Sequence, residues 1–177
     1  MGVFEALKKR SSVHGGDMGT GKVSLGELST ILWAASGLNR GEKGWTVPMA
    51  NGLPPYVTVH VAADDGVFRY DWKAHALVEL SKENVKGKVA SQSFVGRASY
   101  VLVFSTDPEG LKALRDQSAA EEFACVLVGA MTQDVYLAAA ALKLGTRYIH
   151  SMKLDAIQEA LGLPEGARPI AVMPVAK

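Results

Sequence analysis

The chain is poor in features that would direct it to a membrane, an oxidising compartment or nucleic acid. Its one cysteine, Cys125, rules out an internal disulfide, so a reducing cytoplasm is the expected location. A net charge of +1 gives no global attraction to nucleic acid or to an anionic lipid surface. Residues 1–10 lack the apolar centre and cleavage site of a signal peptide. Charged and polar side chains interrupt the apolar stretch 119–143, so no membrane span is expected.

The remaining composition is that of a globular protein. Hydrophobic residues make up 48% of the chain and charged residues 21%. A length of 177 residues fits a single domain over 1–177, or one protomer of an intimate dimer. Cys125 lies in an apolar run and is expected to be a buried small side chain. The four histidines have no metal-ligand spacing, so we expect no metal site.

Hydrophobic periodicity and turn residues predict an α+β fold, with helices around a central antiparallel sheet. Ser24 and Glu27 have the spacing of a capping box, and Asp64–Gly66 has the composition of a hairpin turn. Helices are predicted at residues 2–10, 25–37, 119–143 and 154–161, between 108 and 117, and weakly over 82–92. Strands are predicted at 56–63, 66–71, 76–80, 100–105, 146–149 and 170–175. The 119–143 helix is apolar on more than one face, which places it at a domain centre or a subunit interface.

The glycine-rich stretch 16–22 contains most of a P-loop. The residue after Lys22 is Val23, where Ser or Thr would bind magnesium, and no strand precedes the loop. We therefore do not expect a nucleoside triphosphatase.

Residues Arg10 to His14 form a candidate phosphate site. A phosphate monoester needs positive charge and several donors converging on its oxygens. In an extended segment Arg10, Ser12 and His14 point to one side, with Ser11 between them. Taken alone, a basic residue beside serines is more often solvated surface.

Residues 45–56 form a second candidate site, a loop between a helix and a strand. Proline makes this loop rigid, and the small residues Ala50 and Gly52 permit close backbone approach to a flat ligand. Without further information an ordinary turn before a strand is the simpler interpretation.

Together these segments resemble the nitroreductase-like flavoproteins, particularly the branch of SagB/ThcOx-type dehydrogenases. The resemblance covers nearly the whole chain and includes the last helix and strand at 161–175. It rests on Arg10 and Ser12, on Pro48, Ala50, Leu53 and Pro55, and on Gly129, Gln133, Leu137, Gly145 and Thr146. Departures from the family pattern are His14 in place of Arg or Lys, Met49 for serine, Asn51 for glycine and Asp134 for asparagine.

The resemblance implies an FMN site. Arg10, Ser11, Ser12 and His14 would hold the ribityl phosphate, with Lys177 as a further basic residue. The isoalloxazine ring would meet Pro48, Met49, Ala50 and Asn51 from the partner subunit. Gln133, in the matched helix, is a further candidate cofactor-binding residue. Backbone amides around His150 and Ser151 would face flavin N5, where a fixed donor stabilises negative charge on the reduced ring.

The resemblance also implies a homodimer that passes hydride from NAD(P)H through FMN to an oxidised acceptor, such as a nitroaromatic or quinone, with ping-pong kinetics. The flavin carries the chemistry, so no side chain need act as acid or base. A non-catalytic flavin- or planar-ligand-binding protein on the same dimeric fold is the alternative, favoured by His14, Met49 and Asp134. A purely structural dimer is a third possibility.

Overall fold

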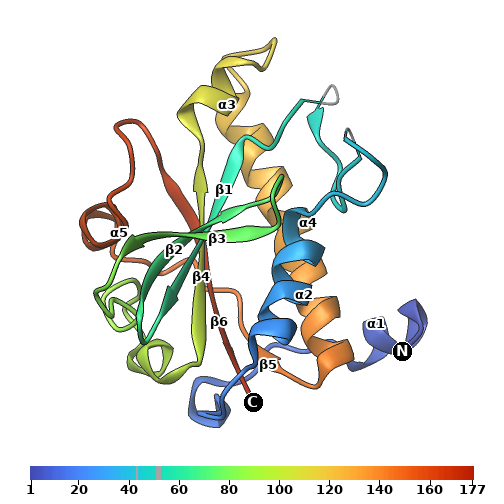
Figure 1. Cartoon of the computed structure of the whole chain (residues 1–177), viewed down its shortest axis with the longest axis vertical. Coiled ribbons are helices and arrows are strands. Elements are labelled where there is room, and N and C mark those ends of the chain that lie inside the picture. The colour runs from blue at the N-terminus through green and yellow to red at the C-terminus, as the bar shows by residue number, and fades with distance from the viewer. Residues whose placement is uncertain (43, 51–52) are drawn as a thin grey trace.

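The computed structural model describes residues 1–42, 44–50 and 53–177, and its centre is a six-stranded antiparallel sheet (Figure 1). The strand order is β3-β2-β1-β4-β6-β5, and every neighbouring pair is antiparallel. The strands are β1 (Val57–Ala63), β2 (Gly66–Asp71), β3 (Ala76–Ser81), β4 (Tyr100–Thr106), β5 (Gly145–Thr146) and β6 (Pro169–Ala176).

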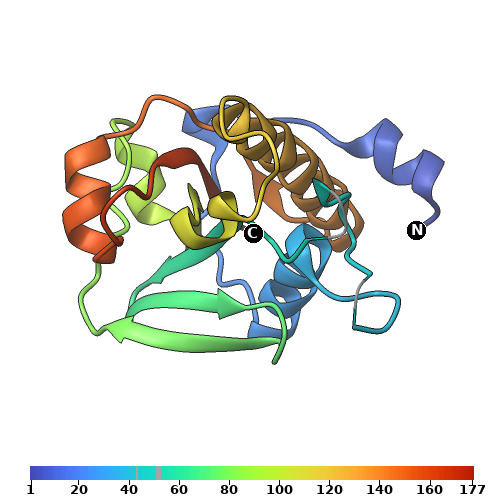
Figure 2. The same cartoon turned by 90° about the horizontal axis from the view of Figure 1, so that it is seen from above.

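Helices cover both faces of this sheet. Figures 1 and 2 show α2 and α4 together on one side and α5 on the other, while α1 projects from the body. The helices are α1 (Val3–Lys9), α2 (Leu25–Ser36), α3 (Pro108–Lys112), α4 (Ala120–Leu142) and α5 (Leu154–Leu161), with short 3₁₀ helices η1 (Gly15–Asp17) and η3 (Ser93–Arg97). The predicted α+β arrangement is confirmed.

Alternation along the central strands produces two hydrophobic cores. Val59 and Val61 of β1 pack with α2 and α4, whereas Ala62 belongs to the core that includes α5. On β4, Phe104 lies in the first core and Val103 in the second. Because successive strand side chains point to opposite faces, these central strands bury apolar residues on both sides, with polar exceptions such as His60 of β1.

Local signals in the sequence located most element boundaries. The capping box forms as predicted, because Ser24 accepts from the Glu27 amide at 3.3 Å and Glu27 accepts from the Ser24 amide at 2.7 Å. The β1–β2–β3 meander is also confirmed.

Two predicted elements differ from the structure. Residues 82–92 are not helical but form turns, because buried Lys86 donates to the Ala98 carbonyl at 2.7 Å and pairs with Asp64. The predicted strand 146–149 reduces to β5 and a single bridge at Ile149. Between these points the Tyr148 amide leaves the ladder and donates to a side chain, the Tyr136 hydroxyl.

Helix α4 differs from expectation in two respects. By length and composition it is apolar enough to cross a membrane, although 39% of its most apolar window is buried inside the protein. Core helices of soluble proteins meet the same criterion, so this property alone does not indicate a span. The prediction that Cys125 is buried is wrong: its side chain is exposed on the outer face of α4. Apolar neighbours in sequence do not fix which face of a helix a residue occupies.

Candidate functional site

The Tyr136 side chain near the C-terminal end of α4 joins three segments of the chain. Its hydroxyl lies 2.7 Å from Ser12 Oγ and accepts from the Tyr148 amide at 2.6 Å. The Arg10 guanidinium lies over its ring, 5.2 Å from the centroid, which is within range of a cation–π interaction. Arg10 and Ser12 are thus brought to one place, as the sequence predicted.

Backbone contacts align the Arg10–His14 segment with the chain after α4. The Val13 amide donates to the Thr146 carbonyl at 3.1 Å, and Arg147 Nη1 donates to the Val13 carbonyl at 3.2 Å. A cavity of about 40 Å³ lies between Ser11, Val13, Tyr136 and Thr146, among others. Arg147 therefore adds a second guanidinium beside this segment.

Neither Tyr136 nor Arg147 was among the site residues predicted from the sequence. Arg147 directly follows Gly145 and Thr146, which match the family pattern. Tyr136 lies in the helix that carries the matching Gln133. Their closeness in sequence to these matching residues could have indicated a place in the site. His14 and Ser11 are exposed, whereas Arg10 is half-buried against Tyr136. A guanidinium, a serine hydroxyl and a second arginine in one place suit a phosphate group.

The Pro48–Ala50 segment lies in a different part of the structure. Met49 and Ala50 pack on the α2–α4 side of the core, and Pro48 is exposed. Asn51 lies outside the described residues. Among those that are described, no hydrogen bond joins this segment to the Arg10–His14 segment. The 45–50 loop is anchored by Trp45, which packs edge-on against Trp72 with ring centroids 5.7 Å apart.

His150 and Ser151 form an exposed turn before α5. His150 Nδ1 lies 3.0 Å from the Ile170 carbonyl, which can only accept, so Nδ1 carries the proton. The Met152 amide donates to the His150 carbonyl at 2.9 Å, and the Ser91 amide donates to Ser151 at 3.4 Å. These bonds hold the turn to β6 and to the segment before η3.

The outer face of α4 carries Gln133, which is exposed. Val126 is 73% exposed on the same helix, and Phe123 is exposed beside it. Asp134 is partly buried, and this burial raises the pKa of its carboxyl group. An apolar stripe and a desolvated carboxylate on one helix are unusual for a surface that faces water.

Lys177 does not join the Arg10–Ser12 cluster. Its Nζ pairs with Glu27 at 2.9 Å, at the start of α2. Its backbone exchanges two hydrogen bonds of 3.2 Å with Gly21, and a Cβ atom on Gly19 or Gly21 would crowd Lys177, which explains these two glycines. Glycine there permits close approach to β6, so the P-loop likeness has a structural origin.

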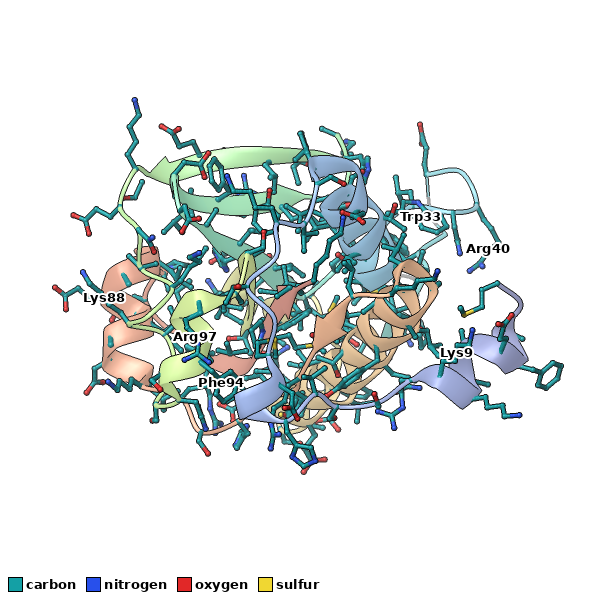
Figure 3. All side chains as sticks on the ribbon, turned by 90° about the horizontal axis from the view of Figure 1, so that it is seen from below. Lys9, Trp33, Arg40, Lys88, Phe94 and Arg97 are labelled. Carbon is teal, nitrogen blue, oxygen red and sulfur yellow. The ribbon has the colours of Figure 1, made fainter. Side chains whose placement is uncertain are left out.

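Figure 3 shows where several side chains lie on the molecule. Lys9 of α1 and Arg40 of the loop after α2 lie at the same end of the molecule, while Lys88, Phe94 and Arg97 lie at another. Helix α1 and the loop after α2 thus lie at one end of the structure.

Two known proteins resemble this chain over nearly all of its length. A provisionally named nitroreductase of Methanocaldococcus jannaschii is 32% identical over 98% of this chain and 89% of its own length. The crystal structure of a provisionally named nitroreductase of Ralstonia eutropha JMP134 superposes with a TM-score of 0.91 at 28% identity, covering all of this chain and 83% of that one.

More distant structures share the fold. The NADPH:FMN oxidoreductase of Vibrio harveyi, complexed with NAD+, has a TM-score of 0.71 at 20% identity, covering 98% of this chain and 67% of that chain. A chain of the E. coli microcin synthetase McbBCD complex has a TM-score of 0.78 at 17% identity, covering 89% of this chain and 65% of that chain. The Nitroreductase family matches residues 18–177. The chain therefore belongs to the nitroreductase family, with its six-stranded α+β fold.

Proposed function

We propose that this protein is an FMN-dependent oxidoreductase that accepts hydride from NAD(P)H and passes it to an oxidised small molecule in a ping-pong cycle. The observation that carries the proposal is the convergence of Arg10 and Ser12 on Tyr136, with Arg147 bound to the neighbouring Val13 carbonyl, in a chain of this family. The protein would be a cytoplasmic single domain over 1–177 that acts on small molecules without nucleic acid or membrane.

FMN, when bound, would accept and donate the hydride. The chain's own residues would bind and orient it. Arg10 supplies a fixed positive charge and Ser12 a hydroxyl to the phosphate, and Arg147 adds charge beside Val13. The turn at His150 and Ser151 would present backbone donors to the ring at N5. The assignment to the SagB/ThcOx-type branch rests on the Pro48–Pro55 sequence.

The site would be completed by a second copy of the chain. The segment Pro48–Asn51 would then reach the ring across the interface. Support comes from α4, where Val126 is 73% exposed, and from α1, where Phe4 is 86% exposed. Exposed apolar side chains on two adjacent helices are typical of a surface that a partner covers.

The direct test of this function is spectroscopic. Purified protein mixed with FMN should retain yellow absorption after gel filtration, and NADH or NADPH should bleach it. Yellow protein that neither nicotinamide bleaches would favour the alternative, a non-catalytic binder, which the exposed His14 in place of a permanent cation also favours. Protein that retains no flavin would eliminate both.

Arg10→Ala tests the phosphate assignment. A charge-assisted hydrogen bond contributes about 1.5–3 kcal/mol, so we expect FMN to bind roughly tenfold to a hundredfold more weakly, measured by quenching of flavin fluorescence. Arg69→Ala removes an exposed arginine on β2, in the β2–β3 hairpin, and should leave the FMN affinity unchanged. Equal affinities for the two variants would remove Arg10 from the site.

A further inference from the structure

The Tyr136 hydroxyl has a fixed direction of hydrogen bonding. The Tyr148 amide can only donate, so the bond of 2.6 Å makes the Tyr136 oxygen an acceptor. A phenol carries one proton, and among the described residues the other partner of this hydroxyl is Ser12 Oγ at 2.7 Å. Tyr136 is buried whereas Ser12 is exposed, so the arrangement that leaves no buried proton unpaired has Tyr136 donating to Ser12.

This direction leaves the Ser12 hydroxyl proton free. Ser12 Oγ accepts from Tyr136, and in the described part of the chain no other acceptor takes the serine proton. The serine is exposed and is two residues from Arg10. We propose that Tyr136 is a positioning residue that holds Ser12 as a hydrogen-bond donor, and Arg10 as a fixed cation, toward the phosphate of FMN. This inference rests on the proposed function.

The aromatic ring of Tyr136 serves the second half of this role. Its side chain is 8% exposed and packs in the core between α4 and the sheet, so the ring is held rigidly. The Arg10 guanidinium 5.2 Å from the ring centroid is therefore held against a fixed surface. A guanidinium ordered before the ligand arrives loses less conformational entropy on binding.

Simple core packing is the competing explanation for Tyr136. Tyr136→Phe separates the two, because phenylalanine keeps the ring, its packing and the stacked Arg10, and removes only the hydroxyl. FMN and riboflavin are suitable probes because riboflavin lacks the phosphate. A packing defect would weaken both flavins, whereas a lost donor to the phosphate weakens FMN alone.

The experiment measures FMN and riboflavin dissociation constants by fluorescence quenching for wild type, Tyr136→Phe, Ser12→Ala and the double variant. For Tyr136→Phe we expect about tenfold weaker FMN binding, and a change of less than about twofold for riboflavin. Because Tyr136 acts through Ser12, the double variant should bind FMN no more weakly than Ser12→Ala, within about twofold.

Tyr70→Phe is the matched control. Tyr70 is also a buried tyrosine in the same core, and its hydroxyl bonds His75 Nδ1 at 2.7 Å on the β2–β3 hairpin. This variant should bind FMN as wild type does, and thermal unfolding of all variants reports their folding.

Three outcomes would overturn the inference. They are unchanged FMN affinity in Tyr136→Phe, equal losses for both flavins, and losses in Tyr136→Phe and Ser12→Ala that multiply in the double variant. With wild type binding FMN, each of these leaves the proposed function intact. Wild-type protein that binds neither flavin would overturn the proposed function and this inference together.

Discussion

At the scale of single residues, His60 shows how burial produces pH dependence. It lies in β1, is 4% exposed, and its Nδ1 has no hydrogen-bond partner among the described residues. Burial, with a smaller contribution from Arg69 opposite it, lowers its pKa to about 4. The native protein therefore holds His60 neutral under conditions that protonate it in the unfolded chain.

The expected result is a loss of stability in acid. The unfolded histidine has a pKa near 6.5, so the contribution of His60 is fully present above that pH and is lost as the pH falls toward 4. Over this window we expect the free energy of unfolding to fall by up to about 3 kcal/mol, measured by urea denaturation at several pH values. His60→Leu should flatten the profile between pH 4 and 6.5, and an unchanged slope in that variant would exclude His60 as its source.

The residues of the candidate site were only partly predictable. Arg10 and Ser12 were predicted as phosphate ligands from their resemblance to the family motif, and the structure brings both to Tyr136. Tyr136 lies 124 positions from Ser12 in the sequence, and no sequence pattern predicts the hydrogen bond between them. Lys177, expected at the phosphate, pairs with Glu27 instead, because strand β6 ends beside the start of α2.

At the scale of elements, the loop before α2 and strand β6 form a close backbone contact. A Cβ atom on Gly19 would overlap the Lys177 carbonyl, and the neighbouring Gly21 exchanges two backbone hydrogen bonds with Lys177. We expect Gly19→Ala to displace this end of β6 and lower the free energy of unfolding by about 1–3 kcal/mol.

Gly16→Ala is the control for this variant, since a Cβ there has no neighbour within 4 Å. Chemical denaturation of the two variants side by side is the measurement. If Gly19→Ala is as stable as Gly16→Ala, the contact between this loop and β6 does not contribute to the fold in solution.

Elements defined by local chemistry were predicted well, and those defined by distant contacts were not. The capping box located the start of α2, and Asp64–Gly66 located the β1–β2 turn. Residues 82–92 have weak helical propensity, but Lys86 is held by groups at 64 and 98. Tertiary contacts override a local preference of a few tenths of a kcal/mol per residue.

At the scale of the whole molecule, the proposed dimer places the outer face of α4 at the interface between the two copies. Val126→Asp places a charge in the exposed apolar stripe of α4. Association of two copies would bury this carboxylate without a partner, which is strongly unfavourable. We expect this variant to shift toward monomer in sedimentation velocity and to lose FMN in parallel, because the proposed site needs both copies.

Val78→Asp on the edge strand β3 is the corresponding control, since this valine is also exposed but lies away from α4 on the β2–β3 hairpin. It should sediment as wild type does. A wild-type protein that is monomeric at all concentrations and still retains FMN would contradict the proposed shared site.

The exposed position of Cys125 has a practical consequence for such measurements. The chain has one thiol, and it lies on α4 next to Val126. A maleimide dye would therefore attach once per polypeptide, at Cys125, on the surface where two copies are expected to meet. The speed of that labelling reaction at rising dilution would report how often this surface opens to solvent, without any engineered cysteine.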